Sequence, residues 1–136
     1  MPSSSWALQK AIHACLTADA VTLALIGGPR IYDDVPRQPV FPYVTYGQST
    51  VRDWSTGTDD AHEHIVTLHV WTRATGRKPA HEISSAIELA LDQQVLILDG
   101  HRLISLRHEF TDVRREPDSE TWRGIVRLRG LTEPSV

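Results

Sequence analysis

Apolar residues recur at helical spacing in two parts of the chain, and this periodicity predicts three helices. The first covers about 5–17, after the capping hydroxyls of Ser3–Ser5. A second, shorter helix is expected from Asp19 to Ile26, because two glycines follow it as a C-terminal stop. Pro79 opens the third and most regular stripe, which consists of Ile83, Ala86, Ile87, Ala90 and Leu91.

Alternating apolar and polar residues predict the strands. Asp99-Gly100 accepts the positive φ angles of a tight turn, so a hairpin is expected between a strand at 95–98 and the next strand. Aromatic and β-branched residues dominate the other stretches, which suits a pleated, half-buried surface. These strands are expected at 42–50, 62–73, 103–113 and 122–131.

The segments between these elements have turn chemistry or extended backbone. Loops are expected at 52–60 and 114–121, and Pro36, Pro39 and Pro42 require an extended connector. The order of helices, strands, one helix and strands predicts an α+β fold. Its sheet is expected to be largely antiparallel or mixed, with the N-terminal helix and the central amphipathic helix packed on one face. The length of 136 residues predicts a single domain, 1–136.

Composition removes several classes of protein. The single cysteine, Cys15, can form neither an internal disulfide nor a zinc–thiolate cluster, which argues against secreted scaffolds and zinc fingers. The strongest apolar run, 18–26, is about half of the roughly 20 residues that span a bilayer, so no membrane association is expected. The N-terminus lacks the pattern of a signal peptide, and a reducing compartment is expected.

Charge is distributed unevenly along the chain. The formal net charge of -3 resides in residues 1–72, whereas 73–136 holds ten basic and ten acidic residues. In the last strand, Arg123, Arg127 and Arg129 share one face, and Trp122 lies on the other. Such a face could contact phosphate, could be a solvated surface with cross-strand partners, or could pair with acidic loops of neighbouring subunits. The sequence leaves these three interpretations open.

Two histidines are the weak candidates for a metal site. His62 and His64 are two apart on a predicted strand, so their imidazoles point to the same face. His69 has the opposite parity, and no other ligand follows at a characteristic spacing. We therefore expect no metal and no cofactor.

Nucleophilic catalysis has little support. Cys15 lies on the apolar stripe of the first helix, where a buried, inert thiol is the usual outcome. Gly27-Gly28 has the spacing of neither a phosphate-binding loop nor a dinucleotide fingerprint. We expect the protein not to be an enzyme.

Several segments, in collinear order, resemble one known family. They are 16–20 (LTADA), 25–28 (LIGG), 30–36 (RIYDDVP), 41–45 (FPYVT), 64–71 (HIVTLHVW), the helix at 76–91, 98–101 (LDGH) and 115–118 (REPD). In this order they are similar to the tail terminator, or tail completion, proteins of long non-contractile-tailed phages, which also occur in prophages and gene transfer agents. The resemblance covers nearly the whole chain.

The resemblance implies a structural virion-assembly protein without catalytic residues. Family members form a hexameric ring that caps the head-proximal end of the tail tube and joins it to the head-completion (connector) proteins. DNA would pass through the ring without sequence-specific binding. The implied location is the virion tail, after assembly in the cytoplasm of the bacterial host.

The candidate interface residues are inferred from residue type and position in the chain, and not from the resemblance. A ring subunit needs two different surfaces and loops that reach its neighbours, and aromatic side chains near such loops are frequent anchors. Trp54 favours an interface, whereas core packing is an equally good interpretation of Trp122. The full set is Arg52, Trp54, Asp59, Asp60, Arg114, Arg115, Glu116, Asp118, Trp122, Arg123, Arg127 and Arg129.

Three alternatives stay open. A neighbouring head–tail connector or stopper protein has a comparable size and also forms rings. A small metal-dependent hydrolase would use His62 and His64, and a nucleic-acid-binding module would use the arginine face, including Arg107. The net negative charge disfavours the last class.

Overall fold

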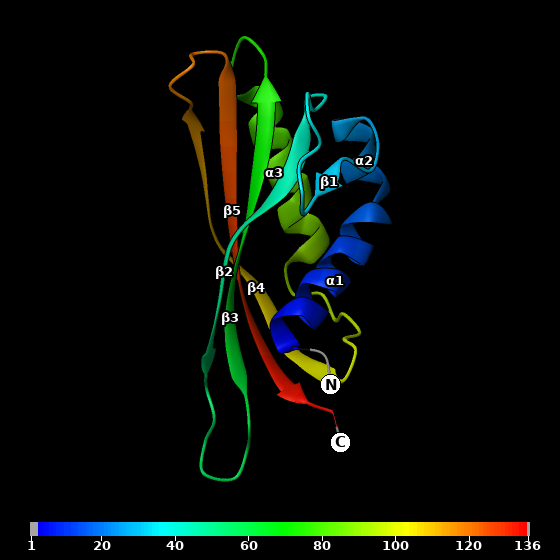
Figure 1. Ribbon diagram of the computed structural model, residues 1–136, viewed down its shortest axis with the longest axis vertical. Coiled ribbons are helices and arrows are strands. Elements are labelled where there is room, and N and C mark those ends of the chain that lie inside the picture. Colours follow the sequence, from blue (N-terminus) through cyan, green and yellow to red (C-terminus); the bar gives the residue numbers. More distant parts are fainter. Residues whose placement is uncertain (1–2, 136) are drawn as a thin grey trace.

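The computed structural model describes residues 3–135 (Figure 1). Ser3 caps the first helix and Asp19 caps the second, each through a side-chain oxygen that accepts a backbone N–H. Gly27 ends the second helix with a φ of 82°, a left-handed conformation that suits glycine. Pro79 lies in the first turn of the third. The helices are α1 (Ser4–Thr17), α2 (Ala20–Ile26) and α3 (Lys78–Leu91).

The strands form one sheet of order β1-β2-β3-β5-β4. β1 runs parallel to β2, and the other neighbours are antiparallel. The predicted α+β fold, with a largely antiparallel sheet and the helices on one face, is therefore confirmed. The strands are β1 (Ile31–Tyr32), β2 (Tyr43–Asp53), β3 (His62–Arg73), β4 (His101–Arg115) and β5 (Thr121–Pro134).

The predicted strand at 95–98 was wrong. The segment makes one isolated bridge, between Ile97 and Arg102, although Gly100 does adopt a positive φ of 75°. The side chains of Val95 and Ile97 are 88% and 94% exposed, so this segment has no buried face that would hold it against the sheet.

The long strands absorb parts of both predicted loops. β2 continues through Asp53 because Arg52 pairs with Glu63 on β3, and β4 continues through Arg115 because this residue pairs with Trp122 on β5. The loops that remain are 54–61 and 116–120, shorter than the predicted 52–60 and 114–121 at their N-terminal sides. Three candidate interface residues that were expected in loops, Arg52, Arg114 and Arg115, therefore lie on strands.

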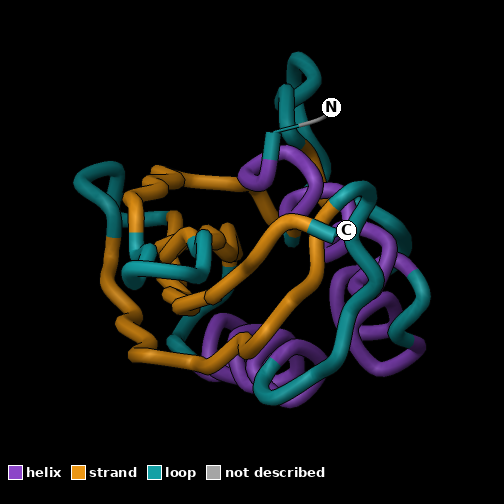
Figure 2. The backbone as a smooth tube through the Cα atoms, turned by 90° about the horizontal axis from the view of Figure 1, so that it is seen from below, coloured by secondary structure: helices purple, strands orange, loops and turns teal. Residues whose placement is uncertain are grey.

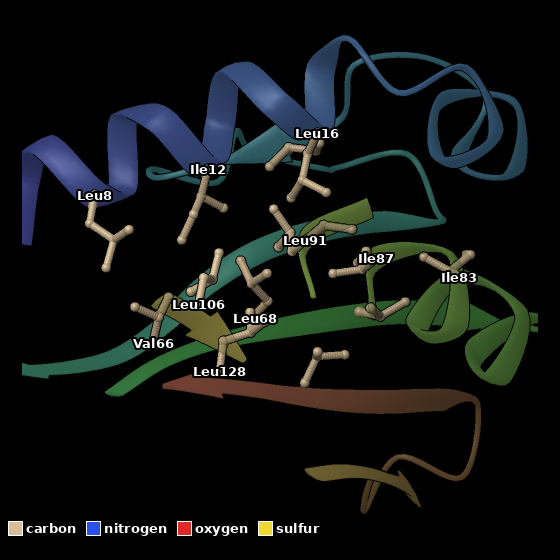
Figure 3. Close-up of a cluster of buried hydrophobic side chains, with 14 of the residues drawn as sticks. Leu8, Ile12, Leu16, Val66, Leu68, Ile83, Ile87, Leu91, Leu106 and Leu128 are labelled. Carbon is tan, nitrogen blue, oxygen red and sulfur yellow. The ribbon is translucent and has the colours of Figure 1, made fainter. Parts of the chain in front are cut away.

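The core lies between the helices and the face of the sheet that they cover (Figure 3). α1 and α3 each contribute an apolar stripe, and the strands contribute every second residue, as the two periodicities require. Gly124 on β5 permits the close approach of α3, because a Cβ at this position would lie 2.5 Å from Ser84 Oγ. The fully buried side chains include Leu8, Ile12, Leu16, Leu68, Ile83, Ile87, Leu91, Leu106 and Leu128.

The β2–β3 hairpin extends beyond the helices at one end of the long axis (Figure 1). We call residues 48–60 the arm; all of them are exposed. The β4–β5 turn lies at the opposite end. Viewed along the long axis, the strands trace a curve and the helices lie outside it (Figure 2). Loops at opposite ends and an uncovered sheet face are thus the surfaces available to partners.

Candidate assembly surfaces

At the base of the arm, a carboxylate, two guanidinium groups and a tryptophan ring form a cluster on the uncovered face of the sheet. Glu63 is 6% exposed, and its carboxylate accepts hydrogen bonds from Arg52 Nε at 2.5 Å and Arg129 Nε at 2.6 Å. Both guanidinium groups lie 5.2 Å from the ring centroid of Trp54. The hydrogen bonds from Arg129 and Arg52 hold the pKa of Glu63 below its ordinary value.

Trp54 remains 44% exposed within this cluster. Its backbone N–H donates to the carbonyl of Ala61, which closes the loop at its base. Asp59 and Asp60 lie at the tip of the arm, in a loop held by backbone hydrogen bonds between Thr56 and Asp59. A fixed aromatic side chain beside an acidic tip suits contact with another protein.

The loop at the other end is organised by two acidic residues. The Asp118 carboxylate accepts hydrogen bonds from the backbone N–H groups of Glu120 and Thr121, both at 2.9 Å, and from Thr121 Oγ1 at 2.8 Å. These bonds, led by the Glu120 N–H, lower the pKa of Asp118. Glu116 Oε1 lies 2.6 Å from Arg123 Nε. Glu116 and Asp118 therefore have structural roles within the subunit.

Trp122 is 5% exposed and packs on the helix-covered face of the sheet. The guanidinium groups of Arg77 and Arg115 each lie 4.8 Å from its ring centroid. Within the subunit, therefore, Trp122 has the core-packing role, and both arginines that flank its ring are exposed. Arg114, on the opposite face, pairs with Asp112.

The arginine face exists as parity predicts, and each of its arginines covers an aromatic ring from a neighbouring segment. Arg123 lies over Trp71 at 5.4 Å and Arg127 over Phe110 at 4.5 Å, while Arg129 lies over Trp54. With Glu63 and Glu116 as counter-ions, much of the positive charge is neutralised within the subunit. This face is therefore an arginine–aromatic surface and not an open basic strip.

The partners Glu63, Trp71 and Phe110 were absent from the sequence-based candidates. Glu63 and Trp71 share the parity of Ile65 on β3, so their face was visible in the sequence. Which arginine each one meets depends on the pairing of β3 with β5, which sequence periodicity leaves undefined.

The two histidine candidates lie at the N-terminal end of β3. His64 is completely buried, and its Nε2 lies 2.9 Å from Thr132 Oγ1. Burial, followed by the neighbouring His62 and His101, lowers the pKa of His64 to about 4. His62 Nδ1 lies 3.2 Å from Ser4 Oγ. Among residues 3–135, no group of three or more His, Cys, Asp or Glu side chains is arranged to hold a metal ion.

Cys15 has the environment of a packed thiol. Its Sγ lies 3.5 Å from the carbonyl oxygen of Ala90 on α3, and burial, with a smaller effect of Asp19, raises its pKa. A raised pKa disfavours the nucleophilic thiolate. Within the described part of the chain, no helix is long and apolar enough to cross a membrane.

The fold and these surfaces define a small α+β assembly subunit, with ordered loops at both ends of a long sheet and an arginine–aromatic face between them. A model of the tail completion protein gp17 family matches residues 10–133. The chain therefore belongs to the tail completion protein gp17 family, and it is a structural virion-assembly protein of the tail.

Two relatives illustrate this membership. Tail completion protein gp17 of Bacillus phage SPP1 is 25% identical over 126 residues, which are 93% of this chain and 92% of the relative. A chain in the structure of the virion of a native gene transfer agent particle superimposes with a TM-score of 0.89 at 32% identity, covering 98% of this chain and 99% of that one. The structure of SPP1 gp17 has the same fold, with a TM-score of 0.63 at 24% identity over 93% of this chain and 89% of that one.

Proposed function

We propose that the protein is a tail terminator, which closes the head-proximal end of a tail tube as a hexameric ring and joins it to the head-completion (connector) proteins. The observation that carries this proposal is the similarity to a chain of a gene transfer agent particle along 98% of the sequence. That similarity supports a role in an assembled particle. The ring acts through shape and contact, without turnover, metal or cofactor.

The surfaces of the subunit support this role. A closed ring requires two different patches that meet in a head-to-tail manner, and a junction between tube and head requires contacts above and below the ring. The arm and the 116–120 loop lie at opposite ends of the long axis (Figure 1). Trp54, Asp59 and Asp60 on the arm are available for such contacts, as is Arg115 near the other end.

DNA would pass through the ring without being held. Strong phosphate binding requires unpaired cationic side chains, and each phosphate neutralised adds to the affinity. Here Arg123 and Arg129 are already paired with carboxylates, and the formal net charge of the chain is -3. These features favour a conduit over a nucleic-acid-binding module.

The test is deletion of the gene in a particle-producing strain, with complementation by the full chain. A terminator that stops tube polymerisation predicts tails of abnormal length and heads without attached tails, and electron microscopy measures both. Tails of normal length in the deletion strain would contradict termination and point to a connector or stopper role. Native mass spectrometry of the protein, alone and bound to tail tubes, should show a hexamer on the tube. A stable dimer under both conditions would contradict the ring.

A further inference from the structure

We propose that neighbouring copies of this chain join their sheets edge to edge, with the outer edge of β2 in the arm of one copy paired to the outer edge of β4 in the next. This inference rests on the proposed ring, and it names the surface through which the ring closes. The second copy is the occupant of both edges.

Both edges of the sheet have long stretches that no strand covers. β1 pairs with β2 only at Val44 and Thr45, so the outer side of β2 from Tyr46 to Asp53 faces no other strand within residues 3–135. β4 is the opposite edge strand; its first half is bridged at Arg102 and bonded by the 92–93 segment, and its outer side from Glu109 to Arg115 faces no other strand within residues 3–135. Long uncovered edges invite pairing with another chain, and monomeric proteins normally shorten or cover them.

The backbone of β2 presents hydrogen-bonding groups at its free edge. Val44 N–H donates outward, to the carbonyl oxygen of Arg30 at 2.9 Å. The direction alternates along an antiparallel strand. The register through the bulge, with Val44 opposite Val70, Ser49 opposite Val66 and Val51 opposite His64, therefore turns the backbone groups of Ser49 and Val51 outward as well.

The same reasoning applies to β4. The carbonyl of Leu106 accepts a hydrogen bond from Gln93 N–H at 2.7 Å, and His108 N–H donates to Asp92 Oδ1 at 2.8 Å, so both residues point outward. The pairing of His108 with Leu128, and of Thr111 with Val126, carries this direction to Thr111.

Ring symmetry fixes the direction of the pairing. A rotation about the ring axis leaves unchanged the component of every strand direction along that axis, and the two edge strands β2 and β4 run in opposite directions. Contact between β2 of one copy and β4 of the next is therefore antiparallel. A register that places Val51 opposite Thr111 matches outward groups with outward groups. It also keeps both side chains on the helix-covered face, because they pair within the subunit with His64 and Val126.

This register gives a strand tilt typical of closed sheets. Within one copy, Val51 is level with His64, Gly130 and Leu106, whereas Thr111 lies further along β4 and beyond the bulge between His108 and Phe110. The offset is about four residue steps, or ~13 Å, across four strands that span ~19 Å. A tilt of about 35° follows, at the edge of the ~35–45° range of closed barrels.

Charge complementarity supports the same arrangement. Asp59 and Asp60 make no ion pair within residues 3–135, and neither does Arg107 on β4. Asp59 lies beside Thr56 at the tip of the arm. With Val51 opposite Thr111, Arg107 of the neighbouring copy lies level with the base of the 54–61 loop, about two residue steps, or ~7 Å, from the level of Thr56 and Asp59. An extended arginine side chain spans that distance, so the unpaired carboxylates lie within reach of an unpaired guanidinium.

Cysteine cross-linking tests the register directly. In full-length protein with Cys15→Ser, the double substitution Val51→Cys and Thr111→Cys should bring two thiols together between neighbouring copies, since paired residues have Cα atoms about 5.5 Å apart. Oxidation of particles assembled with this variant should give a ladder of linked chains up to the ring size. Thr50→Cys with Thr111→Cys is the matched control, because residue 50 points to the other face and should remain unlinked.

The possible outcomes separate the two proposals. If the variant enters particles and no ladder forms, or if the control gives an equal ladder, edge pairing is wrong. Dimers from Val51→Cys alone would show two β2 edges in contact and would also overturn it, as would linkage of Val51→Cys to a different protein. If particles assemble normally without the chain, the proposed function fails, whereas a ladder in purified protein would still support edge pairing.

A charge exchange gives an independent measurement. Asp59→Arg with Asp60→Arg should abolish incorporation into particles, and so should Arg107→Glu. The combination of all three should restore at least half of the wild-type incorporation if these side chains meet. Circular dichroism of each variant checks that the fold is kept. Failure of the combination in folded protein would contradict the register.

Discussion

The two faces of the same sheet differ in what holds their residues. On β5, Gly124, Val126 and Leu128 are buried under the helices, whereas Arg127 and Arg129 on the other face remain half-buried beside aromatic rings. The helix-covered face stabilises the folded state because its apolar surface is removed from water. The other is organised by ion pairs and cation–π contacts, which contribute less to folding when they are exposed. The difference indicates that the helix-covered face provides stability and the open face is available for assembly.

Adjacent residues on β3 show the difference most directly. His64 points to the helix-covered face and is held neutral, while Glu63 points to the open face and is held ionised by Arg52 and Arg129. Both side chains are buried. Their different charge states follow from their surroundings, because His64 is removed from water beside two other histidines, whereas Glu63 has two guanidinium groups.

The largest effect is expected from the helix-covered face. Leu91→Ala removes a fully buried side chain of α3 and should lower the free energy of unfolding by about 2–5 kcal/mol. Leu89→Ala is the matched control on the same helix, since Leu89 is 75% exposed and its truncation should cost less than about 0.5 kcal/mol. Chemical denaturation measures both. Equal losses would mean that α3 does not face the sheet as described.

The second effect is the pH dependence that His64 confers. Its pKa is about 4 in the folded protein and 6.5 ordinarily, so the unfolded chain binds a proton first as the pH falls. Stability is therefore complete above pH 6.5 and is lost between 6.5 and 4, by up to about 3 kcal/mol. His64→Gln should flatten this part of the stability curve, whereas His81→Gln, at an exposed position, should not. An unchanged slope in His64→Gln would contradict the prediction.

Periodicity predicted most of the helix-covered face, because one buried face imposes a clear pattern on the chain. The stripe of α3 and the split of β5 into apolar and arginine faces needed only the 3.6- and 2-residue repeats. The partners of the arginines depend on strand register, so the contact of Arg127 with Phe110 could not be predicted from the sequence. The prediction of a hairpin strand at 95–98 failed because an apolar segment whose side chains are exposed has the same sequence pattern as a half-buried strand. The side chain of Ile97, for example, is 94% exposed.

A smaller effect on stability is expected from the open face. Glu63→Gln leaves Arg52 and Arg129 without their counter-ion. The resulting decrease in the free energy of unfolding at pH 7 should lie between the decreases caused by Leu91→Ala and Leu89→Ala. The lowered pKa of Glu63 means that its contribution is present above its ordinary value of 4.5 and is lost as the pH falls through the folded-state value. The wild type and the variant should therefore converge in strong acid. Glu120→Gln, an exposed carboxylate, is the control; a gap that persists at low pH would contradict this account.

The smallest effect on folding, and the clearest one on assembly, is expected at Trp54. Its ring is 44% exposed between two guanidinium groups, so Trp54→Ala should change the free energy of unfolding by less than about 1 kcal/mol. As an interface anchor it should nevertheless be worth at least about 2 kcal/mol in assembly, and incorporation into particles should fall by more than about tenfold. Trp6→Ala is the control, because Trp6 is similarly exposed, at 50%, but belongs to α1, which lies on the helix-covered side of the sheet. Quantitative immunoblots of purified particles measure incorporation. Equal incorporation of both variants would show that Trp54 does not contribute to the assembly surface. The assignment of stability to the helix-covered face and of assembly to the open face would then be wrong.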